Sequence, residues 1–377
     1  MTRQGMHVVI YTAARPFGGA ENVARLIVSR LADADRVTVV GPTAAVVGQI
    51  ASGNATAASA ISPVIAGKHD LRSALALRRM LRDLDPDVIH FNLSDMASCL
   101  TEIMVGASLP GVALVAVEHS GYQPQTRFQR VAKWISVRLL DGHVAVSKPL
   151  AALVAVSSHV SPNRVTVIAN GVEAVDPYAR SRGAFEPLRL GVVTRLTAEK
   201  GVDVVIDALA SLPGVELHIA GDGPAQKALA EQAVARSVAD RVHFHGWLSD
   251  PSNIYRTVDV YVHPSRADIM PLSVIEAMQH GLPIVATRVG SVGDLVVSGE
   301  TGFLIEPDDT EACVRSIEVL RDDLAKRMAF GEAGRARALQ GFEASSMSEA
   351  YLRVYGAARQ SVQHRRFRRP RRDTDRV

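Results

Sequence analysis

Only two cysteines occur among the 377 residues, and they lie far apart at Cys99 and Cys313. Such a pair indicates neither a disulfide framework nor a thiol metal site, so we expect a reducing compartment. No apolar run approaches the roughly 18 to 20 residues of a membrane-spanning helix, and the N-terminal run at 7–14 is too short for a secretory signal. We therefore expect a cytoplasmic protein, at most peripheral at the inner face of the membrane.

An excess of positive charge is confined to one segment. The formal net charge is +3, but residues 361–377 carry seven Arg and two Asp, which leaves the rest of the chain slightly negative. A short basic tail without a groove-reading motif does not indicate a nucleic-acid-binding protein. Nucleic acid is therefore not among the expected partners.

Aromatic residues are also few, at 5% of the chain, whereas hydrophobic residues make up 47%. Short β-branched runs alternate with segments of helical period, which is typical of parallel βαβ units. The expected strands form two series, at 7–12, 36–40, 88–91, 112–117, 143–146 and 165–168, and at 188–194, 216–220, 241–245, 260–263, 283–286 and 302–305. The pattern predicts an α/β protein with two Rossmann-like domains, because the chain is too long for one core.

A segment at 173–187 separates the two series, with two prolines, a glycine and no apolar periodicity. We therefore expect an N-terminal domain at 1–172, a linker at 173–187 and a C-terminal domain at 188–345. A helix at 346–360 and a basic, disordered tail at 361–377 complete the predicted organisation.

Glycines follow two predicted strands, at the sheet edge where doubly wound domains bind ligands. Gly18 and Gly19 lead from the first strand into a helix, and Gly221 follows a strand of the second series. Glycine permits close approach of a ligand, and a helix N-terminus presents free N–H groups to phosphate. The dinucleotide fingerprint G-x-G-x-x-G is missing, however, so a purely structural turn is the simpler explanation of each.

Two cations, Arg195 and Lys200, lie between a buried strand and a helix expected to begin near Gly201. A guanidinium can fork onto phosphate oxygens, while an ammonium acts as a mobile point charge beside the positive helix terminus. The pair therefore suits a dianionic phosphate group, although two solvated charges in a turn would look the same in isolation.

Eight motifs of this chain, taken in order, resemble the retaining glycosyltransferases of family 4. They are GGAE (18–21), EHS (118–120), VSKPL (146–150), VIANGV (167–172), TRLTAEKG (194–201), AGDGP (220–224), VHFHGWL (242–248) and SRADIMPLSVIEAMQHGLPIVATRVG (265–290). The resemblance implies the glycosyltransferase B fold, in which two Rossmann-like domains face each other across a cleft. It also implies an acceptor-side N-terminal domain and a C-terminal domain that binds a nucleotide sugar.

The family's hallmark is a pair of glutamates separated by seven residues, the second of which accepts hydrogen bonds from the donor's ribose. Glu276 matches that second position. By resemblance, Arg195 and Lys200 hold the donor diphosphate, and Gly221 lies in a loop of the same site. No metal is expected, since the sequence has no carboxylate or histidine cluster with metal-ligand spacing.

The first glutamate of the hallmark is replaced by Asp268, which shortens the side chain's reach by roughly 1.5 Å. Where the family often has glycines, this chain has Ile269 and Met270, and Pro271 has no N–H to donate. Recognition of the sugar is therefore expected to be atypical. The candidate donor-binding positions of this loop are Asp268, Met270, Pro271 and Leu272.

By the same resemblance, His119 lies against the transferred sugar and the backbone of Gly18 and Gly19 borders that site. The implied reaction moves a glycosyl group from a nucleoside diphosphate to an acceptor hydroxyl, with retention of configuration. The departing phosphate can accept the acceptor's proton, and His119 is the alternative base. Two other classes share these features: a sugar-nucleotide epimerase, and a nucleotide-sugar-binding protein whose catalytic site has decayed.

A predicted helix at 125–140 combines an apolar stripe with basic residues, which fits either a helix on anionic lipid or a core-packed helix with a solvated face. The expected apolar face contains Phe128, Val131, Ala132, Ile135 and Leu139. The expected opposite face contains Arg127, Arg130, Lys133 and Arg138, with Trp134 alongside. This helix and the basic tail together indicate peripheral contact with an anionic membrane. A lipid-linked molecule is then one option for the acceptor.

Overall fold

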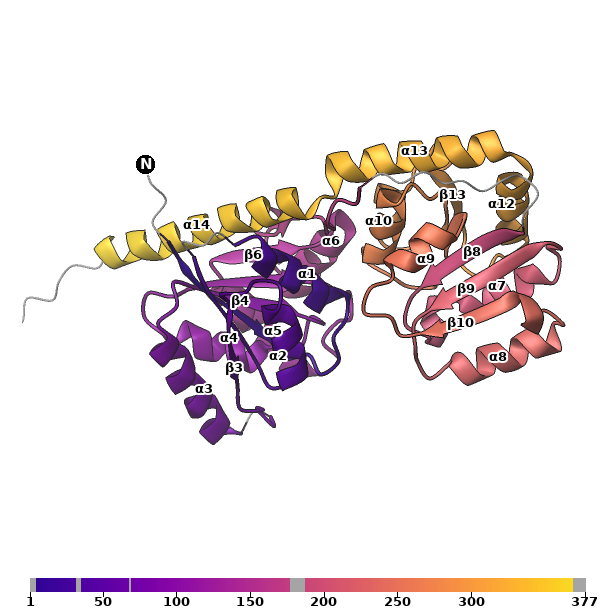
Figure 1. Cartoon of the computed structure of the whole chain (residues 1–377). Coiled ribbons are helices and arrows are strands. Elements are labelled where there is room, and N and C mark those ends of the chain that lie inside the picture. The colour runs from indigo at the N-terminus through magenta and orange to yellow at the C-terminus, as the bar shows by residue number, and fades with distance from the viewer. Residues whose placement is uncertain (1–4, 32–34, 68, 177–186, 369–377) are drawn as a thin grey trace, which may run out of the picture. The chain divides into compact units, whose positions relative to one another are not determined.

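The protein folds into two compact units, each built on a parallel β-sheet (Figure 1). The computed structural model describes residues 5–31, 35–67, 69–176 and 187–368. Unit 1 comprises Met1–Asn170 and Ala344–Val377, and unit 2 comprises Gly171–Glu343. Because the chain returns to unit 1 after unit 2, the C-terminal segment belongs to the fold of the N-terminal half.

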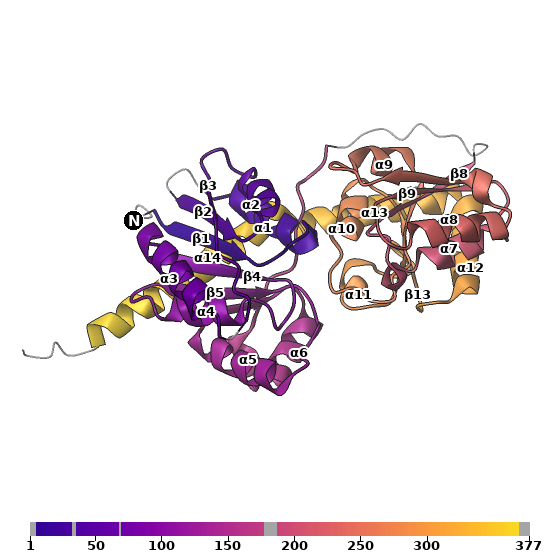
Figure 2. The same ribbon diagram turned by 90° about the horizontal axis from the view of Figure 1, so that it is seen from below.

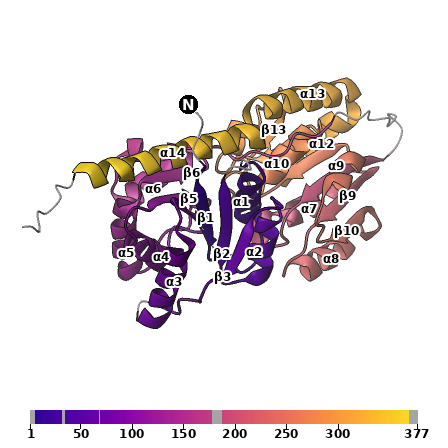
Figure 3. The ribbon, with the colours of Figure 1, turned by 60° about the vertical axis from the view of Figure 1, so that its left-hand side comes forward.

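Unit 1 has a seven-stranded sheet in the order β3-β2-β1-β4-β5-β6-β7. Its strands are β1 (His7–Thr12), β2 (Arg36–Gly41), β3 (Ala58–Ile61), β4 (Val88–Leu93), β5 (Ala113–Glu118), β6 (Gly142–Ala145) and β7 (Thr166–Val167). Its helices are α1 (Gly19–Ser29), α2 (Ala44–Ala51), α3 (Leu71–Leu84), α4 (Leu100–Ala107), α5 (Arg127–Leu139), α6 (Lys148–Ser158) and α14 (Ala344–Arg368), with a 3-10 turn at Pro162–Arg164. One row of helices contains α1, α2 and α14, and another contains α3, α4 and α5, as expected for a doubly wound sheet (Figure 3).

The central strands of unit 1 are buried along their whole length, which explains their nearly continuous apolar sequences. The edge strand β3 escaped sequence detection. Its sequence, Ala-Ser-Ala-Ile, holds a single β-branched residue, and most of it is exposed. Pairing with β2 defines this strand, and that signal is absent from the local sequence.

The long helix α14 packs on the sheet of unit 1. Tyr351 and Tyr355 are fully buried, and the Tyr355 hydroxyl lies 2.6 Å from Nδ1 of His90 on β4. Arg359 forms an ion pair with Asp87 at 3.1 Å. The helix continues to Arg368, into the segment that the sequence predicts to be disordered, and residues 369–377 lie outside the described part of the chain.

Unit 2 has a six-stranded parallel sheet in the order β10-β9-β8-β11-β12-β13. Its strands are β8 (Leu188–Val193), β9 (Val215–Ala220), β10 (Val242–Gly246), β11 (Val260–His263), β12 (Ile284–Thr287) and β13 (Gly302–Ile305). Its helices are α7 (Val202–Leu209), α8 (Gln226–Ala235), α9 (Ser252–Thr257), α10 (Leu272–Gln279), α11 (Val292–Leu295), α12 (Thr310–Asp322) and α13 (Leu324–Gly341), with 3-10 turns at Ala198–Lys200 and Ala239–Arg241.

The core of unit 2 joins apolar side chains of the strands to those of α7, α8 and α12. The two parallel sheets confirm the prediction of an α/β protein with two Rossmann-like domains. Most of the predicted linker, at 177–186, falls outside the described residues. Within the described part of the chain, no helix is both long enough and apolar enough to span a bilayer.

Candidate active site

The glycine loop of unit 1 is held by the first helix that follows it. Gly18 is the N-cap of α1, and its N–H donates to Oε2 of Glu21 at 3.1 Å. A Cβ at Gly18 would lie 3.5 Å from the same oxygen, an ordinary contact, and its φ of −146° suits any residue. Packing therefore does not require glycine at this position, and its predicted contact with a ligand stays a prediction.

His119 at the end of β5 joins the glycine loop through a buried amide. Its Nε2 lies 2.9 Å from Oδ1 of Asn92, and the amide nitrogen of Asn92 donates to the Ala20 carbonyl at 3.2 Å. The Ala20 contact orients the Asn92 amide so that its oxygen faces His119. Nε2 of His119 therefore donates the hydrogen bond to that oxygen, and Nδ1 keeps its lone pair. Burial lowers the pKa of His119 to about 4, which leaves the ring neutral at pH 7. A neutral imidazole with a free Nδ1 can accept a hydrogen bond or a proton.

A buried ionic cluster lies directly before His119. Glu118, fully buried, contacts the Lys133 ammonium, and its Oε1 lies 2.9 Å from Nε2 of His143. Burial alone would raise the pKa of Glu118, but Lys133 and His143 outweigh it and hold the pKa well below its usual range. The cluster therefore ties α5 to the ends of β5 and β6 beside His119.

The Lys133 contact reverses part of the predicted orientation of α5. The sequence places Lys133 on the solvated face and Ala132 on the apolar stripe, but both are buried, together with Ser136 and Val137. Lys133 turns inward because the Glu118 carboxylate needs a countercharge. The other residues of the predicted apolar stripe are exposed instead. They are Phe128 (53% exposed), Val131 (56%), Ile135 (38%) and Leu139 (38%). The prediction that this stripe packs against the core is therefore wrong.

In unit 2, the loop after β8 packs tightly against the loop after β9. Gly221 has φ +139°, and a Cβ there would lie 1.8 Å from the Thr194 carbonyl oxygen. The Leu196 N–H donates to the Asp222 carbonyl at 2.9 Å. Gly221 is therefore required for packing, and its predicted contact with a ligand stays a prediction. Arg195, in the same loop, is 67% exposed and lies 3.6 Å from Glu199.

Lys200 and Asp268 are brought into direct contact. The Lys200 ammonium donates to Oδ2 of Asp268 at 2.8 Å, and Nε2 of His263 lies 3.4 Å from the same oxygen. Both partners of the ion pair are largely buried, at 15% and 18% side-chain exposure. Burial raises the pKa of Asp268, but His263 and Lys200 lower it further, so the carboxylate stays charged. Asp268 thus fixes the position of the Lys200 ammonium.

The loop after Asp268 leads into α10, which carries Glu276. Met270, Pro271 and Leu272 are buried, and Pro271 is the N-cap of the helix. The Tyr255 hydroxyl donates to Oε2 of Glu276 at 2.7 Å. Because the first N–H groups of a helix lack intrahelical acceptors, the start of α10 presents donors beside the loop.

Sequence reasoning missed two residues of these arrangements. Asn92 and Tyr255 belong to no recognisable motif, and only their contacts single them out. His263 ends β11, where a strand-end search does notice it, but its position beside Asp268 requires the fold. The donor-binding and catalytic roles of the predicted residues stay predictions.

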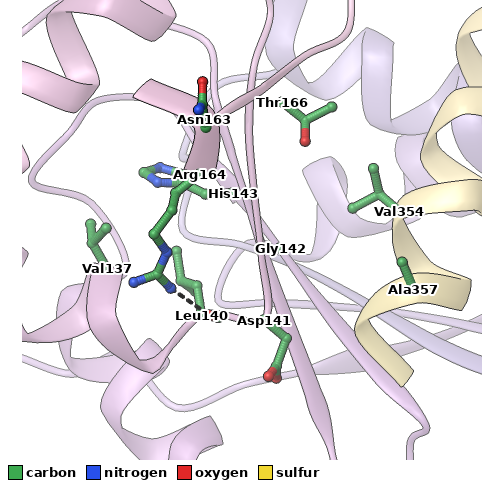
Figure 4. Close-up of a pocket in the computed structure, with 10 residues that line it drawn as sticks. All are labelled: Val137, Leu140, Asp141, Gly142, His143, Asn163, Arg164, Thr166, Val354 and Ala357. Atoms are coloured by element: carbon green, nitrogen blue, oxygen red, sulfur yellow. Dashed lines mark hydrogen bonds between the residues drawn. The ribbon is translucent and has the colours of Figure 1, made fainter. Parts of the chain in front are cut away.

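A pocket of about 300 Å³ lies in unit 1 at the amino ends of β6 and β7, whereas His119 follows the carboxyl end of β5 (Figure 4). Its lining comes from the ends of α5 and β6, the 3-10 turn and α14. Arg164 points across it and donates to the Leu140 carbonyl at 3.5 Å. Ligands of doubly wound sheets bind at the carboxyl ends of strands, so this pocket is not part of the candidate site.

Comparison with known proteins identifies the relatives of both units. The family model described as Glycosyltransferase Family 4 matches residues 17–175, and the model described as Glycosyl transferases group 1 matches residues 181–337. Together they match well over half of the chain. A glycogen synthase of Mycobacterium tuberculosis is 28% identical over 316 residues, covering 80% of this chain and 76% of that protein.

Two further relatives extend the comparison. The lipopolysaccharide core biosynthesis mannosyltransferase LpsB of Rhizobium meliloti is 30% identical over 58% of this chain and 66% of its own. The crystal structure of Anabaena HepE in complex with UDP superposes with a TM-score of 0.81 at 20% identity, covering 93% of this chain and 100% of that chain. At 20% identity, this structural similarity shows that the two proteins share a fold.

Proposed function

This chain belongs to glycosyltransferase family 4, and from that premise we propose that it transfers a sugar from a nucleoside-diphosphate sugar to an acceptor hydroxyl, with retention of anomeric configuration. The observation that carries the proposal is the ion pair of Lys200 with Asp268 at the strand ends of unit 2. An ammonium fixed in a largely buried position is prepared for the charge that develops on a leaving diphosphate.

The neighbouring groups supply the rest of the donor site. The exposed Arg195 guanidinium is available to fork onto phosphate oxygens, and the first N–H groups of α10 add hydrogen-bond donors. Glu276, oriented by the Tyr255 hydroxyl, accepts hydrogen bonds from the ribose. This set contains cations and dipoles sufficient to stabilise the diphosphate without a metal ion.

Proton transfer needs only a weak base, because the departing phosphate oxygen can accept the acceptor's proton on the same face. His119 is neutral at pH 7 and carries its lone pair on Nδ1, so it can accept a hydrogen bond from the transferred sugar. We therefore assign His119 to sugar positioning, with the phosphate as the base.

A thermal-shift panel of UDP, GDP, ADP and dTDP tests the donor proposal. UDP is the first choice, since solved structural neighbours include HepE bound to UDP and to UDP-glucose. Saturation at about 100 times the dissociation constant adds roughly 2.7 kcal/mol of stability. One base should raise the melting temperature above the others, with and without EDTA, and a flat panel would overturn the proposal. Formation of an epimerised sugar from the donor alone, without acceptor, would instead indicate an epimerase.

We further propose that α5 rests on an anionic membrane, so that the acceptor is lipid-linked. Its exposed apolar stripe is flanked by three exposed arginines, Arg127, Arg130 and Arg138, with Trp134 among them. The guanidinium of Arg138 lies 4.0 Å from the centre of the Trp134 ring. The stripe, the arginines and an interfacial tryptophan together match a helix lying in the lipid headgroup region, and α5 and α6 lie side by side in unit 1 (Figure 2).

Co-sedimentation with vesicles tests the membrane contact. The parent should bind vesicles rich in phosphatidylserine and release them at high salt, because each basic residue near the surface contributes about 1 kcal/mol of screened attraction. Val131→Asp should abolish binding, whereas Val234→Asp, at a 67% exposed position on α8, should not. Equal binding by both variants would exclude α5 as the contact.

A further inference from the structure

Three histidines and a glutamate gather on one face of the unit 2 sheet, at its β9–β10 edge. His218 on β9 is the register partner of His243 on β10, and Glu216 precedes His218 by two residues. Leu217, Ile219 and Val242 alternate with them and point into the core. Because side chains alternate along a strand, Glu216, His218 and His243 share the opposite face.

The separations within this cluster are those of potential metal ligands. One ligand atom from each of Glu216, His218 and His243 lies within 4.8 Å of the others. Nε2 of His218 is 3.6 Å from Oε2 of Glu216, and Nδ1 of His218 is 3.1 Å from Nε2 of His245. In a tetrahedral zinc site with bonds of about 2.0 to 2.1 Å, neighbouring ligand atoms lie about 3.4 Å apart. Small side-chain rotations therefore suffice to close the cluster around one ion.

Two buried nitrogens at the cluster have no hydrogen-bond partner among the described residues. Nε2 of His218 is buried and has no hydrogen-bond partner, and the same holds for Nε of Arg189, which lies 3.4 Å from the Glu216 carboxylate. Arg189 is the competing cation, and a bound ion would share the carboxylate with it.

We propose that Glu216, His218 and His243 bind one Zn²⁺ ion, which ties the edge strand β10 to β9. Two imidazoles and one carboxylate suit zinc, whereas Mg²⁺ and Ca²⁺ prefer oxygen ligands. His245 contacts Nδ1 of His218, on the other side of the ring from Glu216, so the remaining coordination position is left to water. Local sequence spacing did not indicate this site, because strand pairing brings its ligands together. The site is independent of the proposed sugar transfer, since Lys200 and Asp268 contribute nothing to it.

Calorimetric titration of Zn²⁺ into the full, tag-free chain after dialysis against EDTA tests the site. One ion per chain should bind, and binding should raise the melting temperature. His218→Gln and His243→Gln should each weaken binding about tenfold or more, by loss of one ligand. His364→Gln, at an exposed histidine on α14, is the matched control and should bind zinc like the parent. Equal binding by all four proteins, or none by the parent, would overturn the proposal.

X-ray absorption of the zinc-loaded parent provides a measurement that needs no variant. Its spectrum should contain scattering from at least two imidazole rings, and a shell of oxygens alone would refute the assignment. Activity with the preferred donor should be the same with and without EDTA. A result against the zinc site would therefore not count against the proposed transfer reaction. Likewise, a result against the transfer reaction would not count against the zinc site.

Discussion

Replacement of Lys133 by methionine isolates the buried ionic cluster of unit 1. Methionine keeps most of the side-chain volume, but it leaves the Glu118 carboxylate, which has 0% exposure, with His143 as its remaining contact. Removal of one partner of a buried ion pair costs about 3 to 5 kcal/mol, because the other charge stays in a low-dielectric environment. We expect Lys133→Met to lower the stability of unit 1 by that amount at pH 7.

The pH dependence of that loss follows from the pKa of Glu118, which the cluster lowers. In the parent, the stabilisation is present above the carboxyl's ordinary pKa of 4.5 and is lost as the pH falls through the lower folded value. In Lys133→Met, burial is no longer outweighed by Lys133, so the carboxyl takes up a proton at higher pH. The gap between parent and variant should therefore shrink as the pH falls from 7 toward 4.5.

Urea unfolding read by tryptophan fluorescence measures this loss. The chain has two tryptophans, so a Trp247→Phe background leaves Trp134 on α5 as the reporter of unit 1. Glu118→Gln combined with Lys133→Met should cost less than the sum of the single changes, because neither charge is then left alone. Lys227→Met, at a 90% exposed lysine, should change stability by less than about 0.5 kcal/mol. A Lys133→Met protein as stable as this control would refute the reasoning.

Three further outcomes follow from the geometry of unit 2. Lys200→Ala should lower turnover about 10² to 10³-fold at a temperature where the variant is still folded, and Lys227→Ala should match the parent in the same assay. Tyr255→Phe removes the 2.7 Å hydrogen bond to Glu276, the proposed ribose ligand, so it should raise the donor KM by about tenfold, measured by initial rates; an unchanged KM would contradict that role. Gly221→Ala should destabilise the protein by more than about 1 kcal/mol, because its Cβ would meet a carbonyl oxygen at 1.8 Å. Gly293→Ala, which meets nothing within 4 Å, should be neutral in the same denaturation assay.

Most strands of both sheets could be predicted, because their runs of apolar and β-branched residues stand out in the sequence. His7–Thr12 and Val260–His263 lie where the β-branched runs indicate them. The missed strand, Ala58–Ile61, is defined by pairing with a neighbour instead of by its residues. The return of α14 to unit 1 also depends on long-range packing, such as Tyr355 against His90, which no local pattern encodes.

The candidate site could be predicted one residue at a time, but its contacts could not. Motif order singled out Lys200 and Asp268 separately, and the fold places them 2.8 Å apart. The same limit explains the error on α5, where helical periodicity locates the helix but cannot tell which face meets the core. Lys133 is buried because it pairs with the buried carboxylate of Glu118, fifteen residues earlier.

Binding of the preferred nucleoside diphosphate and of its monophosphate, to the parent and to Lys200→Ala, tests the central claim most directly. If Lys200 holds the second phosphate, the parent should prefer the diphosphate by about tenfold or more, in line with a charge-assisted hydrogen bond. Lys200→Ala should lose that preference while it keeps its affinity for the monophosphate. Equal weakening of both ligands, or a preference that survives the substitution, would contradict the assignment of Lys200 to the leaving diphosphate.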